Sequence, residues 1–305
     1  MSGEPKQRRR QIGRSEVAAL VSLEDEGFIE HRGHRVWWGA TAGGPVPLLT
    51  IHGGPGICHD CLEPLAALPR RVVFYDQYGC GRSDRATRPT DYDLPLFIEE
   101  IDAVRAALGL ERLHLFAHSY GGLLALAYLF GQPEGVVSLT LSNSFASVPA
   151  LVAGWHRRLE ELPTVSADVL LAGDPSHPAY GAALGEFVQR FVYRGELPEP
   201  VLRSMGNSGA EVYARMHGSS WFTPDGLLAD VDLTDRLGEI AVPTLVIGGE
   251  LDQCVPELAH AIHKGIPGSE LTIFAGRHFP FFESPADFLD LVQGFLARAE
   301  RAATA

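Results

Sequence analysis

The sequence predicts an α/β fold in which helices cover both faces of a mostly parallel sheet. Short apolar runs typical of buried strands alternate with longer segments whose apolar residues recur every three or four positions. Strand signals vanish between about residues 146 and 232 and resume near residue 243. Because alternating strands and helices build a parallel sheet, the interruption is interpreted as an inserted, mainly helical cap.

The first half of the chain supplies most of the predicted sheet. Two β-rich runs flank Arg32-Gly33, which indicates a hairpin. Between residues 94 and 110 the apolar positions recur with helical spacing, and Gln132-Pro133 ends the next helical segment. The predicted strands are 27–30, 35–38, 47–51, 72–75, 112–116 and 136–141, and the predicted helices are 94–110 and 120–130.

The second half begins with the insertion, which is broken at Gly173-Asp174-Pro175, at residues 195–200 and at Gly206-Asn207. The core pattern then returns with strands at 243–248 and 271–274 and helices at 256–264 and 285–302. We therefore predict a mobile N-terminal arm at residues 1–25, an α/β core at 26–145 and 233–305, and a helical cap at 146–232.

Composition restricts the possible partners. The chain of 305 residues is 46% apolar and 21% charged, so disorder is not its main state. Its net charge of −13 gives no electrostatic support for nucleic-acid binding. The longest apolar stretch, residues 123–130, is too short to span a membrane, and no signal peptide is readable. We expect a cytoplasmic protein with no membrane partner, and its oligomeric state stays open.

Ser119 is the candidate nucleophile. It lies in Ala117-His118-Ser119-Tyr120-Gly121, where a predicted strand passes directly into a predicted helix. Such a sharp turn lifts the serine hydroxyl above the sheet and tolerates only small residues two positions before and after it. A serine between small residues is common, so the strand-to-helix context carries this prediction.

A serine hydroxyl needs a base, and the base needs a group that orients it. Asp252 follows one buried strand, and His278 follows the next strand in the same way. Both are therefore expected at the carboxyl edge of the sheet, where ligand clefts form. The chain order Ser119, Asp252, His278 is typical of the α/β-hydrolase fold.

The loop 52–56 (HGGPG) follows an early strand and is a candidate oxyanion hole. We assign the backbone N–H groups of Gly54 and Tyr120 as the donors for a developing oxyanion. A plain glycine turn is the alternative. A nucleotide-binding loop is disfavoured, because no Lys-Ser or Lys-Thr follows it and no Gly-x-Gly-x-x-Gly is present.

No cofactor or metal is expected. Cys58 and Cys61 stand three residues apart, but a zinc site would need a second pair of ligands that the sequence does not offer. A thioredoxin-like role would need a different strand–helix context. The four cysteines are interpreted as small buried side chains rather than a disulfide framework.

The sequence resembles the proline iminopeptidase family in three places: the Ser119 turn, the loop 52–56 and residues 76–83 (DQYGCGRS). Within that family it is most similar to the tricorn-associated aminopeptidases. The resemblance covers about residues 28–297, including 216–223 (MHGSSWFT) in the cap. It implies that Ser119, Asp252 and His278 form the catalytic triad beneath a helical cap.

The chain departs from that family at two positions. The aminopeptidases hold the substrate's free α-amine with carboxylates, one in the cap segment and one just after the catalytic aspartate. Here those positions are Trp221 and Gln253, and neither side chain carries negative charge. A buried ammonium without counter-ions costs several kcal/mol, so we expect a substrate that lacks a free α-amine.

These observations predict a serine hydrolase that cleaves an amide or ester through an acyl-enzyme. Its substrate is expected to be a small molecule or short peptide-like compound, with His52, Trp221 and Gln253 in the binding site. Three alternatives stay open: a true prolyl or N-terminal aminopeptidase, a biosynthetic acyltransferase or lyase with the same triad, and a non-catalytic ligand-binding protein. Epoxide hydrolase and dehalogenase chemistry would require an aspartate at position 119.

Overall fold

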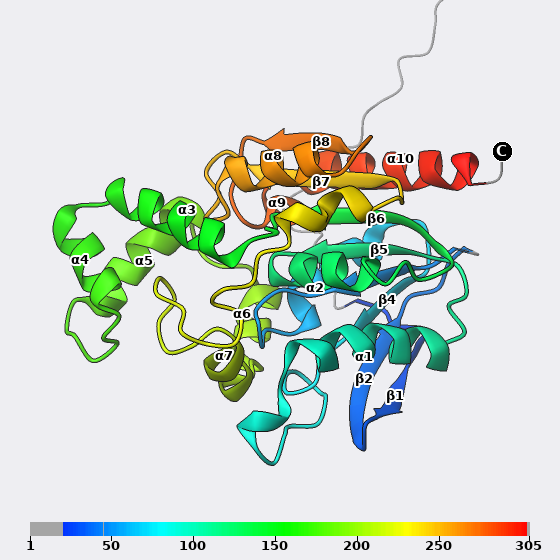
Figure 1. Ribbon diagram of the computed structural model, residues 1–305, viewed down its shortest axis with the longest axis horizontal. Helices are drawn as coiled ribbons and strands as arrows, with labels where there is room; N and C mark the ends of the chain where they lie inside the picture. The colour runs from blue at the N-terminus through cyan, green and yellow to red at the C-terminus, as the bar shows by residue number, and fades with distance from the viewer. Residues whose placement is uncertain (1–20, 45, 304–305) are drawn as a thin grey trace, which may run out of the picture.

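The computed structural model describes residues 21–44 and 46–303, and these residues form one eight-stranded sheet with helices around it (Figure 1). Residues 1–20 of the predicted arm lie outside the described residues, and Asp25 already begins the first strand. The strands are β1 (Asp25–His31), β2 (His34–Ala40), β3 (Leu48–Ile51), β4 (Val72–Tyr75), β5 (Leu113–His118), β6 (Val136–Ser142), β7 (Thr244–Gly249) and β8 (Glu270–Phe274).

The sheet is mostly parallel, as predicted. Its strand order is β1-β2-β4-β3-β5-β6-β7-β8, and all pairs from β4 to β8 are parallel. The predicted hairpin is β1 and β2, which pair antiparallel, and β2 also pairs antiparallel with β4. Arg32 and Gly33 both have positive φ, 47° and 83°, as the tight turns that match strand twist require.

Helices follow the predicted segments with small shifts at their ends. Helix α1 stops at Ala107 rather than at residue 110, because Gly109 adopts a left-handed conformation (φ 62°). No helix in the described part of the chain has the length and apolar character needed to cross a membrane. The core helices are α1 (Leu94–Ala107), α2 (Tyr120–Leu129), α8 (Pro256–Gly265), α9 (Pro280–Glu283) and α10 (Pro285–Ala302), with 3₁₀ helices η1 (His59–Ala67), η2 (Pro89–Asp91) and η3 (Thr234–Glu239).

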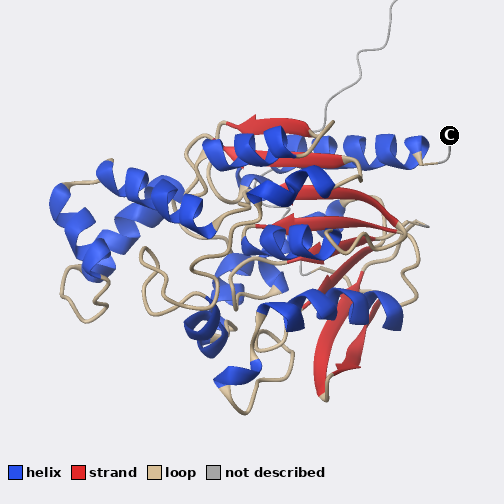
Figure 2. Ribbon diagram, viewed as in Figure 1, coloured by secondary structure: helices blue, strands red, loops and turns tan. Residues whose placement is uncertain are grey.

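Helices lie on both faces of the sheet (Figure 2). Phe116 of β5 contacts Phe288 of α10, with ring centroids 6.1 Å apart. Its neighbour Ala117 pairs with Leu141 of β6, and Leu141 lies against Gly122 of α2. Since successive side chains of a strand point to opposite faces, α10 and α2 cover opposite faces. Strands β3, β4, β5 and β7 are consequently buried along their whole length.

The segment between β6 and β7 is helical and projects to one side of the sheet (Figure 1). Its two ends run side by side, because Val148 donates its N–H to the Val231 carbonyl and Leu233 donates to the Ala146 carbonyl. These backbone bonds hold the start and the end of the insertion together. Its helices are α3 (Val148–Glu160), α4 (Thr164–Ala172), α5 (Tyr180–Phe191), α6 (Glu199–Gly206) and α7 (Ala210–Met216).

Candidate active site

Ser119 lies in a strained turn between β5 and α2. Its backbone angles are φ 54° and ψ −126°, a conformation that L-residues rarely adopt. The turn leaves no room for larger neighbours, since a Cβ on Gly121 would lie 2.3 Å from the Ile51 carbonyl oxygen. The Ser119 N–H donates to the Ser142 carbonyl of β6 at 3.0 Å, which fixes the turn against the sheet. This is the strand–turn–helix context that a nucleophilic serine requires.

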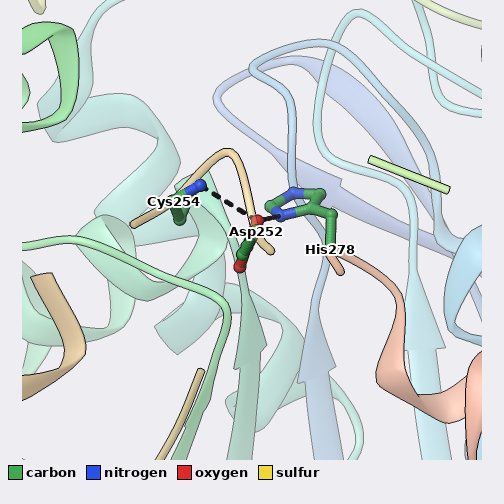
Figure 3. Close-up of side chains that lie close together, drawn as sticks. All are labelled: Asp252, Cys254 and His278. Atoms are coloured by element: carbon green, nitrogen blue, oxygen red, sulfur yellow. Dashed lines mark hydrogen bonds and ion pairs between the residues drawn. The ribbon is translucent and has the colours of Figure 1, made fainter. Parts of the chain in front are cut away.

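Asp252 and His278 meet at the carboxyl edge of the sheet, after β7 and β8 (Figure 3). His278 Nδ1 donates to Asp252 Oδ1 at 2.8 Å, because an ionised carboxylate can only accept. The Cys254 N–H donates to the same oxygen at 2.9 Å, and Asn143 Nδ2 donates to Oδ2 at 2.7 Å. The carboxylate is therefore fixed from several sides, and Nε2 of His278 is left as the acceptor.

Ser119 and His278 line the same cavity. Within the described part of the chain, the Ser119 hydroxyl makes no hydrogen bond to His278. Catalytic hydrogen bonds are often long without substrate and tighten when it binds. The structure thus places the candidate nucleophile and the candidate base on the wall of one cavity.

A second histidine, His118, stands next to the candidate base. The rings of His118 and His278 have centroids 4.7 Å apart. His118 Nδ1 donates to the Ser142 carbonyl at 3.1 Å, and burial, aided by nearby His278, lowers the pKa of His118 well below its usual value. A neutral ring that is bonded to the backbone supports the elbow, whereas His278 carries the oriented acceptor.

The proposed oxyanion donors border the same cavity. Gly54 has φ 123°, and a Cβ there would lie 2.5 Å from the Gly56 nitrogen, so only glycine fits. A Cβ on Gly53 would lie 3.1 Å from Ser119 Cβ, which brings this loop against the elbow. Tyr120 is the first residue of α2, where backbone N–H groups have no partner within the helix. Both N–H groups thus stay candidate donors for an oxyanion near Ser119.

The cavity has a volume of about 480 Å³ and extends from the elbow beneath the helical insertion. Its walls are mostly apolar, with Leu151, Val188 and Met205 contributed by three different helices of the insertion. Among the residues that the structure describes, no Asp, Glu, Lys or Arg lines the cavity, and the ionisable groups that do are imidazoles, thiols and phenols. The site therefore presents oriented polar groups at one end of an uncharged chamber.

Two of the three residues expected to bind substrate line this cavity. Trp221 stacks on Phe222 with ring centroids 5.8 Å apart. Gln253 is only 7% exposed, and its N–H donates to the Phe191 carbonyl at 2.9 Å. Both side chains are neutral, and both line the cavity.

The third, His52, does not line the cavity, so the expectation that it binds substrate is corrected here. It is completely buried, and its Nε2 accepts the Gln77 N–H at 2.9 Å. Burial lowers the pKa of His52 to about 4. The ring turns inward and joins the loop 52–56 to Gln77.

The buried His52 makes a prediction about stability. Between pH 6.5 and about 4 the unfolded chain protonates this residue and the folded chain does not, so stability falls as the pH is lowered through this window. Toward the lower end of this window, the free energy of unfolding that is lost through His52 approaches about 3 kcal/mol. We expect urea unfolding of His52→Gln to depend less on pH in this window than that of the wild type. The exposed His177→Gln is the control, and equal slopes in all three proteins would contradict the assignment.

Within residues 21–44 and 46–303, two groups of side chains could hold a metal ion. In each group, Asp252–Cys254–His278 and His59–Asp60–Glu63, the candidate ligand atoms lie within 4.8 Å of one another. The first already forms the Asp–His pair, and burial, with Asp252 nearby, raises the pKa of the Cys254 thiol well above its usual value. In the second, Arg203 forms ion pairs with both carboxylates. Both groups thus have partners within the chain.

Cys58 and Cys61 are buried and not joined by a disulfide. The Cys58 thiol donates to Asp60 at 2.9 Å, and burial raises the pKa of both thiols. Ser204 of α6 donates its hydroxyl to the Cys58 carbonyl at 2.8 Å. The pair therefore belongs to the contact between η1 and the insertion.

Comparisons with known proteins agree with this fold. The family model described as the alpha/beta hydrolase fold matches residues 46–285. The chain is 38% identical to a proline iminopeptidase of Saccharolobus solfataricus over 260 residues, which cover 82% of this chain and 84% of that protein. It is 36% identical to a proline iminopeptidase of Lactobacillus delbrueckii subsp. bulgaricus over 267 residues, which cover 82% of this chain and 90% of that protein. The crystal structure of the Mycobacterium smegmatis proline iminopeptidase has a TM-score of 0.86 at 32% identity and covers 92% of this chain and 100% of its own.

Proposed function

Since the chain belongs to the α/β-hydrolase family, among its proline iminopeptidase-like members, we propose that it cleaves amides or esters through an acyl-enzyme on Ser119. Its substrate carries an apolar acyl group without a free α-amine. The serine hydrolase chemistry follows from the family, while the acyl-enzyme and the substrate class are our proposal. The uncharged cavity that borders Ser119 is the observation that supports the substrate class.

Each catalytic group has one role in the proposed reaction. The Ser119 oxygen attacks the substrate carbonyl while His278 Nε2 takes its proton, and Asp252 stabilises the resulting imidazolium. The N–H groups of Gly54 and Tyr120 bind the oxyanion of the tetrahedral intermediate. His278 then returns the proton to the leaving amine or alcohol, which departs as the acyl-enzyme forms. Water attacks the ester in the second half by the same route and releases the acid.

The absence of carboxylates from the described lining residues argues against a charged amine. Glu250 lies close to Gln253 in the sequence and Asp225 lies close to Trp221, so either acid is a candidate to hold an amine in place of the missing carboxylates. Glu250 is exposed, and the Asp225 carboxylate accepts the Ser219 N–H within its own loop. Neither lines the cavity. A substrate ammonium would lose its water without gaining a counter-ion, whereas a neutral apolar acyl group gains from burial.

Introducing the missing charges tests this substrate class. We expect Trp221→Glu combined with Gln253→Glu to raise kcat/KM for a free-amine anilide relative to its N-acylated analogue by about 10-fold or more, because each carboxylate supplies a counter-ion. The measurement is hydrolysis of matched anilides with a free, an acylated or an absent α-amine.

The neutral double variant Trp221→Gln plus Gln253→Asn is the matched control, since it changes size and polarity without adding charge. It is expected to leave the preference against the free amine in place. If the wild type itself cleaves proline anilides efficiently and rejects their N-acylated analogues, the proposed substrate class is wrong.

A further inference from the structure

Asn143 directly follows β6 and is bonded to both of the turns that carry Asp252 and His278. It is 1% exposed, and its φ of 53° lies in the left-handed region, which asparagine tolerates better than most residues. Its backbone N–H donates to the Ile247 carbonyl of β7 at 2.8 Å. The residue is therefore fixed to the strand that precedes Asp252.

The side-chain amide of Asn143 joins the two turns. Nδ2 donates to Asp252 Oδ2 at 2.7 Å and to the carbonyl of Arg277, the residue before His278, at 3.0 Å. Both partners can only accept, which assigns the nitrogen to this side of the amide, and its two hydrogens serve both bonds. The Ser142 hydroxyl donates to Oδ1 at 2.8 Å and fixes the other side. One side chain thus connects the acid to the base.

The orientation of the Asp252 carboxylate depends on this amide. Oδ1 accepts from His278 Nδ1 and from the Cys254 N–H (Figure 3). Among the described residues, Oδ2 accepts from Asn143 alone. Asp252 is completely buried, so an Oδ2 without a donor would be costly. Without the amide, the carboxylate is expected to turn toward another donor and to weaken the bond between Oδ1 and His278.

The other ionisable side chains around Asn143 and Asp252 have partners elsewhere or carry no charge. They are His118 on the Ser142 carbonyl, Arg158 on the Asp252 backbone carbonyl, Arg277 on the Glu283 carboxylate, and the thiol of Cys254, whose pKa burial raises. Within the described part of the chain, Asp252 has one ion-pair partner, His278. The neutral amide therefore fixes the carboxylate without cancelling the charge that stabilises the imidazolium.

We propose that Asn143 is a positioning residue, which holds Asp252 in the orientation that its bond to His278 requires. Asn143 does not line the cavity and acts through Asp252 rather than on the substrate. This inference rests on the proposed function and adds a residue to its machinery. Removal of the amide should slow the chemical step and leave substrate binding unchanged.

Asn143→Gly removes the amide, and glycine adopts a φ of 53° without strain. We expect kcat for an N-acylated ester to fall about 10- to 100-fold, as for the loss of a hydrogen bond to a charged group, and KM to stay within about 3-fold of the wild type. Gln132→Gly is the matched control, because it removes an exposed amide at a residue with φ 50° that follows α2. It should keep the wild-type kcat.

Asn143→Asp tests positioning through the pH profile. The change places a carboxyl of nearly the same shape beside Asp252 Oδ2, and two adjacent carboxyls cannot both ionise easily, so one pKa is raised. When protonated, the new carboxyl donates to Oδ2 as the amide does, and when ionised it repels Asp252. The ratio of variant to wild-type kcat/KM should therefore rise about 10-fold or more between about pH 8.5 and 5.5. A purely structural residue would lower the urea midpoint and leave this ratio independent of pH.

Wild-type kcat in Asn143→Gly, or a pH-independent ratio for Asn143→Asp, would overturn the inference and leave the proposed function intact. Proton NMR of Ser119→Ala gives a readout without turnover. The signal of the His278 Nδ1 proton should move upfield when Asn143→Gly is added, because its bond to Asp252 weakens. An unchanged signal would also overturn the inference. No hydrolysis and no fluorophosphonate labelling of Ser119 in the wild type would refute the proposed function, and the NMR signal would still decide whether Asn143 orients the Asp252–His278 pair.

Discussion

Replacing Ser119 with alanine is expected to lower kcat by about 10³-fold or more while leaving the fold intact. The change removes the hydroxyl that forms the acyl-enzyme and alters the side-chain volume very little. The strained backbone at this position (φ 54°) is held by Gly121 and by the bond to Ser142, neither of which needs the hydroxyl. Hydrolysis of an N-acylated ester and the urea midpoint are to be measured side by side.

The matched control is Ser166→Ala, which removes a serine hydroxyl from helix α4, far along the chain from the elbow. It should keep wild-type activity and wild-type labelling by a fluorophosphonate, whereas Ser119→Ala should lose both. Full activity of Ser119→Ala, in protein free of wild-type enzyme, would exclude the proposed mechanism. Labelling that persists in this variant would point to another nucleophile.

The sheet and the positions of the candidate triad were predictable because they depend on local patterns. Asp252 and His278 each follow an apolar strand, and parallel strands place their carboxyl ends on one edge of the sheet. Glycine two residues after Ser119 was likewise a local signal of the turn, and the structure adds why it is needed: the Ile51 carbonyl lies where a Cβ would be.

The direction of individual side chains could not be read from local patterns. His52 begins the loop 52–56 and was expected to bind substrate, yet its ring is buried, and Gln77, which is 25 residues further on, donates to it. Trp155 carried no sequence signal that it lines the cavity, since an aromatic residue in an amphipathic helix usually packs in a core. Only the packing of α3 on the turn after β7 brings this residue to the cavity.

The contact between η1 and the insertion also could not be predicted from the sequence. Cys58-His59-Asp60-Cys61 was considered as a metal site and rejected because a second pair of ligands is missing. No helix was predicted in this segment. In the structure Arg203 of α6 forms ion pairs with Asp60 and Glu63. An arginine about 140 residues away in sequence gives no local signal, so this partner of the acidic side chains could only be found in three dimensions.

Replacing His278 with alanine is expected to cost about as much as losing the nucleophile, on the order of 10³-fold or more in kcat, because the proton of Ser119 then has no acceptor. His118 is the informative comparison, since its ring lies beside that of His278 with centroids 4.7 Å apart. His118 Nδ1 donates to the Ser142 carbonyl, so it has no carboxylate to stabilise its charged form. Burial also lowers the pKa of His118 well below its usual value.

We therefore expect His118→Ala to keep kcat within about 10-fold of the wild type, a loss that reflects a less rigid elbow rather than a missing base. Added imidazole distinguishes the two roles, because it can fill the space left by His278→Ala and accept the Ser119 proton. It should raise the activity of that variant and leave that of His118→Ala unchanged. A severe loss in His118→Ala together with a harmless His278→Ala would reverse the assignment, and the bond between His278 Nδ1 and Asp252 would then only stabilise the fold.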